Sequence, residues 1–288
     1  MSGEGPSPVV QRRRLRTELR KTRQEEARLT QEQVAEAMDW SLSKVIRIEN
    51  GSVGISTNDL KALLRLYKVI DTERTDELVA LAKAGRERSW WSGYREVAPQ
   101  SLLQLIGYES AAFITRNFET LLIPGLLQTE EYARTVIREF EGSTRHLETL
   151  VEIRMRRQDL LDRADPPPLL FFVLDEAVVH RQIGGKAVMR RQIRRLIEVA
   201  DRPNVSVEVV PFSAGAHPGL KGPFVVIEFP DPEDDDVLYL ESARGDLISR
   251  DAPDEVADYR EAFEILRKLS LGPDRSLTYL GKLADEMA

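Results

Sequence analysis

The sequence predicts a multi-domain protein in which an all-α domain of five helices is followed by an α+β domain with a small mixed sheet. Three observations support this fold class. The chain has 288 residues, more than one small core requires. Helical periodicity prevails in roughly the first ninety residues, and apolar runs of strand length occur only after Pro168. Finally, residues 1–70 hold 13 Lys/Arg and 9 Asp/Glu, whereas the remainder holds 28 and 39.

These features predict a disordered tail over residues 1–9, a helical domain over 10–88 and the α+β domain over 89–288. A basic domain on an acidic body is expected when one domain meets a polyanion. The chain has no cysteine, which excludes disulfides, thiolate nucleophiles and cysteine-based zinc sites. No apolar run reaches the length of a membrane span, and the polar start does not resemble a secretory signal. We therefore expect a cytoplasmic protein with no membrane partner.

The first predicted helix spans about 10–28 and places Leu15 and Leu19 on one face. Its other face is basic and comprises Arg12, Arg16, Arg20 and Arg23. The second helix begins after Thr30, whose hydroxyl can accept an amide hydrogen of the first turn. Gln33 stands three residues later and can reach back, which completes a capping box.

Capping residues also delimit the next two helices. Ser41 begins the third helix, and Gly51 supplies the left-handed residue that ends it. Ser56 with Asp59 repeats the box pattern before a fourth helix, and the fifth helix is predicted over about 71–88.

The second and third helices fit the helix-turn-helix pattern. Small Ala35 allows the helices to approach closely, and Trp40 fills the turn. Asp39 stands where this turn usually has glycine, and aspartate tolerates a left-handed backbone better than most residues. The positions that face inward are Val34, Ala35, Met38, Val45 and Ile48.

The opposite face of the third helix is the predicted DNA contact, because a recognition helix enters the major groove by its amino-terminal part. Arg47 is placed to contact guanine O6 and N7, and Leu42 to pack on a thymine methyl group. An ordinary helical hairpin with a solvated face is the alternative, but it leaves the caps, turn and inward positions unexplained. The expected contacts are Gln31, Ser41, Leu42, Ser43, Lys44 and Arg47, with Arg16 and Arg20 holding phosphates.

The segment over about 13–71, with LTQEQVAEAMDWSLSKVIRIENG at its centre, resembles the helix-turn-helix domain of the lambda-repressor and Cro type, also called the xenobiotic-response-element family. The resemblance implies five helices, sequence-specific binding to a double-stranded DNA operator and usually a homodimer. By position, the phosphate-contacting glutamine of the family falls on Gln31. Its base-contacting positions fall on Leu42, Ser43 and Arg47, although family members often have glutamine where Leu42 stands.

The second domain is predicted to contain three or four strands, packed with helices as an α+β domain. LLFFVLD has the fully apolar character of a buried central strand. NVSVEVVP alternates, and PFVVIEFP and DVLYLES follow as further strands. Helices are predicted at about 100–106, 129–140, 144–163, 176–182 and 186–200, near Pro253 and after Pro273.

This second domain resembles the carboxyl-terminal part of actinomycete regulators of the WhiJ type. The matching pieces are IPGLLQTEEYAR, DEA, VMRRQI, PNVSVEVVPF and GAHPGLKGPF, in this order. The resemblance implies a developmental or antitoxin-like transcription regulator that works with a small partner protein, and it implies no known ligand.

Catalytic and metal-binding patterns are not found. His146, His180 and His217 lie far apart in sequence without ligand spacing. There is no phosphate-binding loop and no dinucleotide fingerprint. The sequence therefore predicts no enzyme activity and no cofactor or metal.

The resulting hypothesis is a nucleoid-associated transcription regulator, a repressor and homodimer, controlled through its second domain by a small partner protein or a ligand. Two alternatives remain open. In one, an antitoxin-like protein mainly sequesters a small partner. In the other, the second domain senses a metabolite, and a ligand-dependent rise in melting temperature distinguishes this case.

Overall fold

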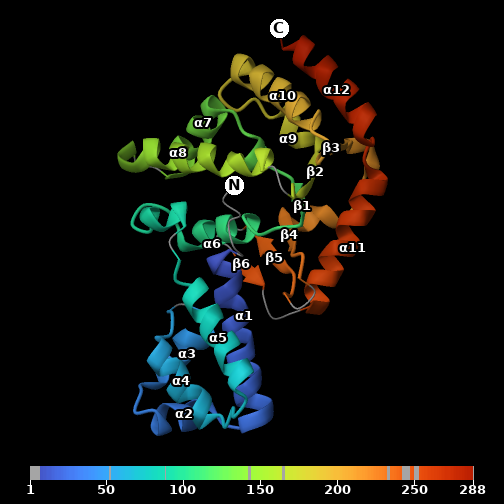
Figure 1. The fold of residues 1–288 in the computed structure, drawn as a ribbon. Helices are drawn as coiled ribbons and strands as arrows, with labels where there is room; N and C mark the ends of the chain where they lie inside the picture. The colour runs from blue at the N-terminus through green and yellow to red at the C-terminus, as the bar shows by residue number, and fades with distance from the viewer. Residues whose placement is uncertain are drawn as a thin grey trace. The chain divides into compact units, whose positions relative to one another are not determined.

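The chain forms two compact units, Met1–Ser92 and Gly93–Ala288, in a computed structural model (Figure 1). The predicted tail lies mostly outside the described residues, although Pro8 and Val9 belong to the first helix. The structure describes residues 7–51, 53–87, 89–141, 144–163, 166–231, 234–241, 247–249 and 253–287.

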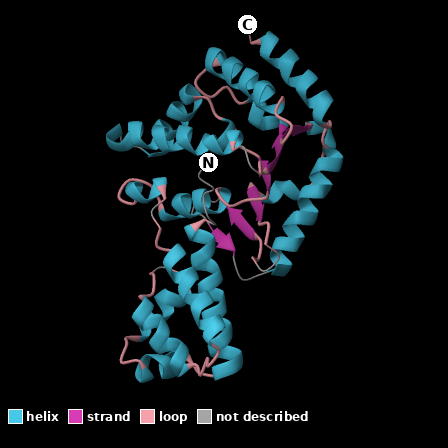
Figure 2. Ribbon diagram, in the orientation of Figure 1, coloured by secondary structure: helices cyan, strands magenta, loops and turns pink. Residues whose placement is uncertain are grey.

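The five helices predicted for the first unit are all present (Figure 2). The first of them passes from α-helix into a π-helical turn, Thr22–Ala27, before the chain reverses. The helices are α1 Pro8–Lys21, α2 Gln31–Ala37, α3 Leu42–Glu49, α4 Thr57–Leu66 and α5 Thr72–Ala84. Buried apolar side chains from all five form one core.

The predicted helix starts of the first unit are confirmed, and one half of the box predicted for Ser56 and Asp59 is seen, in which the Ser56 hydroxyl accepts the Asp59 amide. Thr30 and Gln33 form the reciprocal capping box of α2, and the Ser41 hydroxyl accepts the Lys44 amide at the start of α3. Asp39 adopts a left-handed conformation with φ of 52°, and Gly51 follows α3 with φ of 76°. Local chemistry therefore fixes where the two central helices begin and how the turn between them is made.

The second unit is built on a six-stranded mixed sheet of order β3-β2-β1-β4-β5-β6. β1, β2 and β3 are parallel, whereas β4, β5 and β6 continue the sheet in antiparallel pairs. The sheet is larger than the predicted three or four strands, because β1 and β6 are additional. The strands are β1 Ile114–Glu119, β2 Leu169–Asp175, β3 Val205–Val210, β4 Phe224–Glu228, β5 Val237–Leu240 and β6 Leu247–Ser249.

Both faces of the sheet are covered. Leu170 and Phe172 of β2 belong to a core that includes side chains of α10 and α12, whereas Val173 belongs to a second core with α11. This alternation explains why β2 is apolar throughout. The helices of this unit are α6 Gln100–Glu109, α7 Glu130–Glu141, α8 Leu147–Arg157, α9 Glu176–His180, α10 Lys186–Ala200, α11 Pro253–Leu269 and α12 Pro273–Glu286.

The helix predicted over 144–163 is divided into three. Thr144–His146 and Gln158–Asp162 are 3₁₀ turns, and only α8 between them is α-helical. Among the residues that the structure describes, no helix combines the length and apolar character needed to cross a membrane.

Replacing the fully buried Phe172 with alanine tests the position of β2 between β3 and β1 of the sheet. Phe172→Ala is expected to lower the free energy of unfolding of the second unit by about 3–5 kcal/mol, since it leaves a cavity. The control Phe140→Ala alters a side chain that is 74% exposed on α7 and is expected to cost less than about 0.5 kcal/mol. Urea unfolding followed by circular dichroism measures both, and equal losses would contradict this placement.

Candidate nucleic-acid interface

The exposed face of α3 carries the residues predicted to contact DNA. Val45 and Ile48 are buried in the core of the first unit, as expected. Ser41, Leu42, Ser43 and Arg47 are exposed on the other side, together with Ile46, which sequence analysis had not selected. The Arg47 Nε donates to the Ser43 carbonyl at 3.3 Å, so that its side chain lies back along the helix surface. The exposed face of α3 therefore combines hydroxyl, guanidinium and apolar groups.

Lys44 already has two partners within the unit. Its Nζ lies 3.2 Å from an Asp59 carboxylate oxygen and 3.7 Å from the centroid of the Trp40 ring. A cation above an indole face is attracted by the ring quadrupole. Lys44 therefore connects the turn, the start of α3 and the first turn of α4. A DNA contact by Lys44 stays a prediction.

A buried ion pair joins the first helix to the end of α3. The Arg23 guanidinium donates to both carboxylate oxygens of Glu49, at 2.6 and 2.9 Å, and the two side chains are 8% and 7% exposed. A further donor of Arg23 reaches the Leu29 carbonyl at 2.8 Å. The hydrogen bond with Glu49 raises the pKa of Arg23, which outweighs the opposing effect of burial. Such a bidentate pair fixes both the distance and the relative orientation of the first helix and α3.

The same carboxylate holds Gln31, the residue predicted to contact a phosphate. The Gln31 amide nitrogen donates to Glu49 Oε2 at 2.8 Å. Gln31 is partly exposed at the first position of α2. Glu49 consequently links Arg23, Gln31 and α3 in one network, although Glu49 and Arg23 were not among the predicted site residues.

The two basic residues predicted to hold phosphates differ in exposure. Arg16 is buried and donates to the Asn50 carbonyl at 3.2 Å, just after α3. A side chain at Gly51 would meet the Arg16 guanidinium at 2.6 Å, so the two residues pack closely. Arg20 is partly exposed. Arg16 therefore supports the end of α3, and phosphate contacts by either residue stay predictions.

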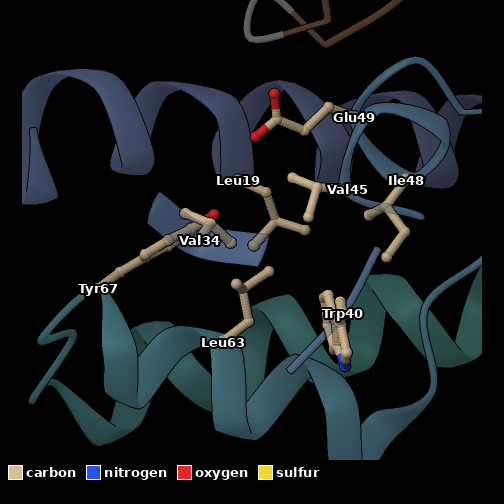
Figure 3. A pocket seen from close by; sticks show the side chains of 8 residues that line it. All are labelled: Leu19, Val34, Trp40, Val45, Ile48, Glu49, Leu63 and Tyr67. Carbon is tan, nitrogen blue, oxygen red and sulfur yellow. The ribbon is translucent and has the colours of Figure 1, made fainter. Parts of the chain in front are cut away.

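Figure 3 shows the small apolar pocket beneath these helices. Leu19, Val34 and Val45 converge there from three helices, and Trp40 of the turn closes one side. Glu49 stands at its margin. The close packing of these apolar side chains holds α2 and α3 in place beneath the exposed face of α3.

In the second unit, two of the three histidines form internal contacts. His180 Nε2 lies 2.6 Å from the Tyr279 hydroxyl, which also bonds to Glu176. The His217 side chain is almost fully buried, with Nε2 3.6 Å from an Asp175 carboxylate oxygen.

A polar cluster that sequence analysis missed lies at the carboxyl end of β1. Desolvation raises the pKa of Glu119 to about 8, with a smaller contribution from the Glu241 carboxylate. Asn117 is buried, and its carboxamide oxygen has no hydrogen-bond partner among the described residues. Desolvation and the neighbouring Arg157 guanidinium lower the pKa of Arg154 to about 10. In the sequence, the polar residues of the segment ITRNFE were the sign of this cluster.

Arg154 belongs to the hydrogen-bonded support of the loop after β1. Its guanidinium donates to the Gln128 side chain at 2.8 Å. Gln158 donates to the carbonyls of Gly125 and Gln128, and Gln192 donates to the Leu127 carbonyl. Side-chain amides therefore hold this loop, which lies where open α/β sheets commonly bind ligands.

Comparisons with known proteins give two family matches. Residues 14–78 match the family described as "Helix-turn-helix domain", and residues 102–282 match the family described as "Domain of unknown function (DUF5753)". The first match covers all of α2 and α3 and supports a DNA-binding regulator. No curated protein and no solved structure matches this chain.

Removing one member of the buried ion pair tests its importance. Glu49→Gln leaves the Arg23 guanidinium buried without a counter-charge and is expected to destabilise the helical unit by about 3–5 kcal/mol. Glu26→Gln is the matched control, because Glu26 pairs with Arg74 at the surface and its side chain is 45% exposed. That change is expected to cost less than about 1 kcal/mol. Thermal unfolding compares the two variants, and similar costs would show that the buried pair has no special role.

Proposed function

Because the chain belongs to the DUF5753 family and a helix-turn-helix domain precedes the family domain, we propose that it is a sequence-specific transcription regulator that acts as a repressor. The observation that carries this proposal is the exposed face of α3. Its side chains are presented to solvent, while Glu49 and the apolar core hold the opposite side.

In the proposed complex, α3 lies in the major groove of an operator. Arg47 contacts guanine O6 and N7, a pairing that Arg side chains form with two hydrogen bonds. Leu42 packs on a thymine methyl group, and Ser43 contacts a base or phosphate. Gln31 contacts a phosphate with the amide that Glu49 orients. The remaining proposed phosphate contacts are Ser41, Lys44, Arg16 and Arg20.

We further propose a homodimer in the cytoplasm, associated with the nucleoid. A two-fold operator then separates the two recognition helices by about 34 Å, one turn of DNA. In this scheme, residues 10–88 bind DNA and residues 89–288 receive the signal. The resemblance to WhiJ-type regulators supports a small partner protein as that signal. An antitoxin-like role, with DNA binding serving autoregulation, remains the alternative.

The polar cluster at the carboxyl end of β1 supports a second candidate, a regulator that senses a small anionic metabolite. Arg154 is partly exposed and donates a hydrogen bond to the Gln128 side-chain amide oxygen, which is uncharged. Glu119, with its raised pKa, remains largely protonated at neutral pH and can donate a hydrogen bond to an anion. Titratable groups with perturbed pKa values favour a binding site at this edge.

Arg47→Ala is the direct test of the DNA contact. The change is expected to weaken operator binding by roughly 1–3 kcal/mol and to relax base preference at one position. Lys83→Ala removes an exposed positive charge on α5, outside the helix-turn-helix pair, and serves as the control. Titration of selected duplexes at fixed salt measures both variants. Unchanged affinity and unchanged preference in Arg47→Ala would refute the assignment.

The second candidate predicts that inorganic phosphate or citrate raises the melting temperature of the full chain by stabilising the folded state. Arg154→Met is expected to abolish this rise, whereas Arg190→Met, a change at an exposed residue of α10, leaves it unchanged. A rise of equal size in both variants would contradict an anion site at β1. Co-purification of a small protein with the native chain would instead favour the partner-controlled regulator.

A further inference from the structure

The recognition helix exposes an apolar residue that the proposed contacts leave unused. Ile46 is 40% exposed on α3, although its neighbours Val45 and Ile48 are buried. A single exposed isoleucine is common on protein surfaces. Here, however, Leu42 lies one turn earlier on the same helix and is 38% exposed. Two branched side chains in an i, i+4 relation form a short apolar strip on this face.

Helical geometry places Ile46 between the proposed base contacts. Successive residues of an α-helix are separated by about 100° around the axis, so Ile46 lies about 40° from Leu42 and about 100° from Arg47. Ser43 lies between Ile46 and Arg47 on this arc. The apolar strip and the polar groups that are proposed to contact bases therefore share one exposed arc of about 140° around the helix. A surface that met only phosphates would gain nothing from it.

The major groove offers one apolar group for such a strip, the C5 methyl group of thymine. Isoleucine has no hydrogen-bond donor or acceptor in its side chain, so it cannot contact the polar edges of guanine, cytosine or adenine favourably. We propose that Ile46 determines specificity by packing on a thymine methyl group next to the base recognised by Arg47. This inference rests on the proposed function, because it requires α3 in the major groove.

The proposal has a chemical consequence beyond thymine. A 5-methylcytosine presents its methyl group at the same C5 position of a pyrimidine ring in the same groove. The strip formed by Leu42 and Ile46 is therefore expected to distinguish methylated from unmethylated cytosine when cytosine replaces the contacted thymine. Operator affinity would then depend on base methylation at that position.

The test begins with duplexes that the full-length protein selects from a random pool. Each thymine of the selected site is then replaced singly by deoxyuridine, which lacks only the methyl group, and affinity is measured by fluorescence anisotropy. For the unaltered protein we expect a 3- to 10-fold loss at the position contacted by Ile46. Ile46→Ala is expected to lose this discrimination and to bind thymine and uracil duplexes equally at that position.

Matched variants separate the contact from changes in folding. Ile46→Val keeps a branched apolar side chain and should retain most of the discrimination, whereas Ile46→Ser should lose it. Ile70→Ala alters a residue that is 91% exposed outside α3 and should behave like the unaltered protein. If Ile46→Ala still distinguishes thymine from uracil at every position, the inference is wrong. If no duplex is selected at all, the proposed function itself fails.

Discussion

The DNA-binding unit depends on the buried ion pair between Arg23 and Glu49. Each charge would be costly to bury alone, and together they satisfy each other through two hydrogen bonds. Because Glu49 also accepts from Gln31, one carboxylate orients the first helix, the start of α2 and the end of α3. This network and the apolar core together hold the exposed face of α3 in a defined geometry.

The helical unit was largely predictable because its signals are local. Each signal concerns contacts or backbone conformation within a few residues along the chain. The structure confirms the capping pair Thr30 and Gln33, the cap Ser41 and the left-handed turn residue Asp39. The inward positions of α2 and α3 followed from helical periodicity. The Arg23–Glu49 pair was not predictable, since it joins residues 26 positions apart and periodicity assigned Arg23 to a basic solvent face.

In the second unit, β2 to β5 were predictable from their apolar or alternating residues, whereas β1 and β6 were not. β1 lies at the centre of the sheet but carries Arg116, Asn117 and Glu119. Arg116 is tolerated there because it pairs with Glu228 of the neighbouring strand β4. Glu119 stands at the strand's carboxyl end. Long-range partners of this kind cannot be inferred from spacing, so the polar cluster of the candidate ligand site became visible only in three dimensions.

The π-helical turn Thr22–Ala27 affects how this chain should be aligned with its relatives. This turn is the last one of the first helix, because Arg28 after it is left-handed and donates its amide to the Arg23 carbonyl. Arg23 lies near the start of the turn, so a residue added or lost after it would shift the end of the helix without moving Arg23 away from Glu49. The corresponding gap in an alignment therefore belongs after this arginine, within the last turn of the first helix.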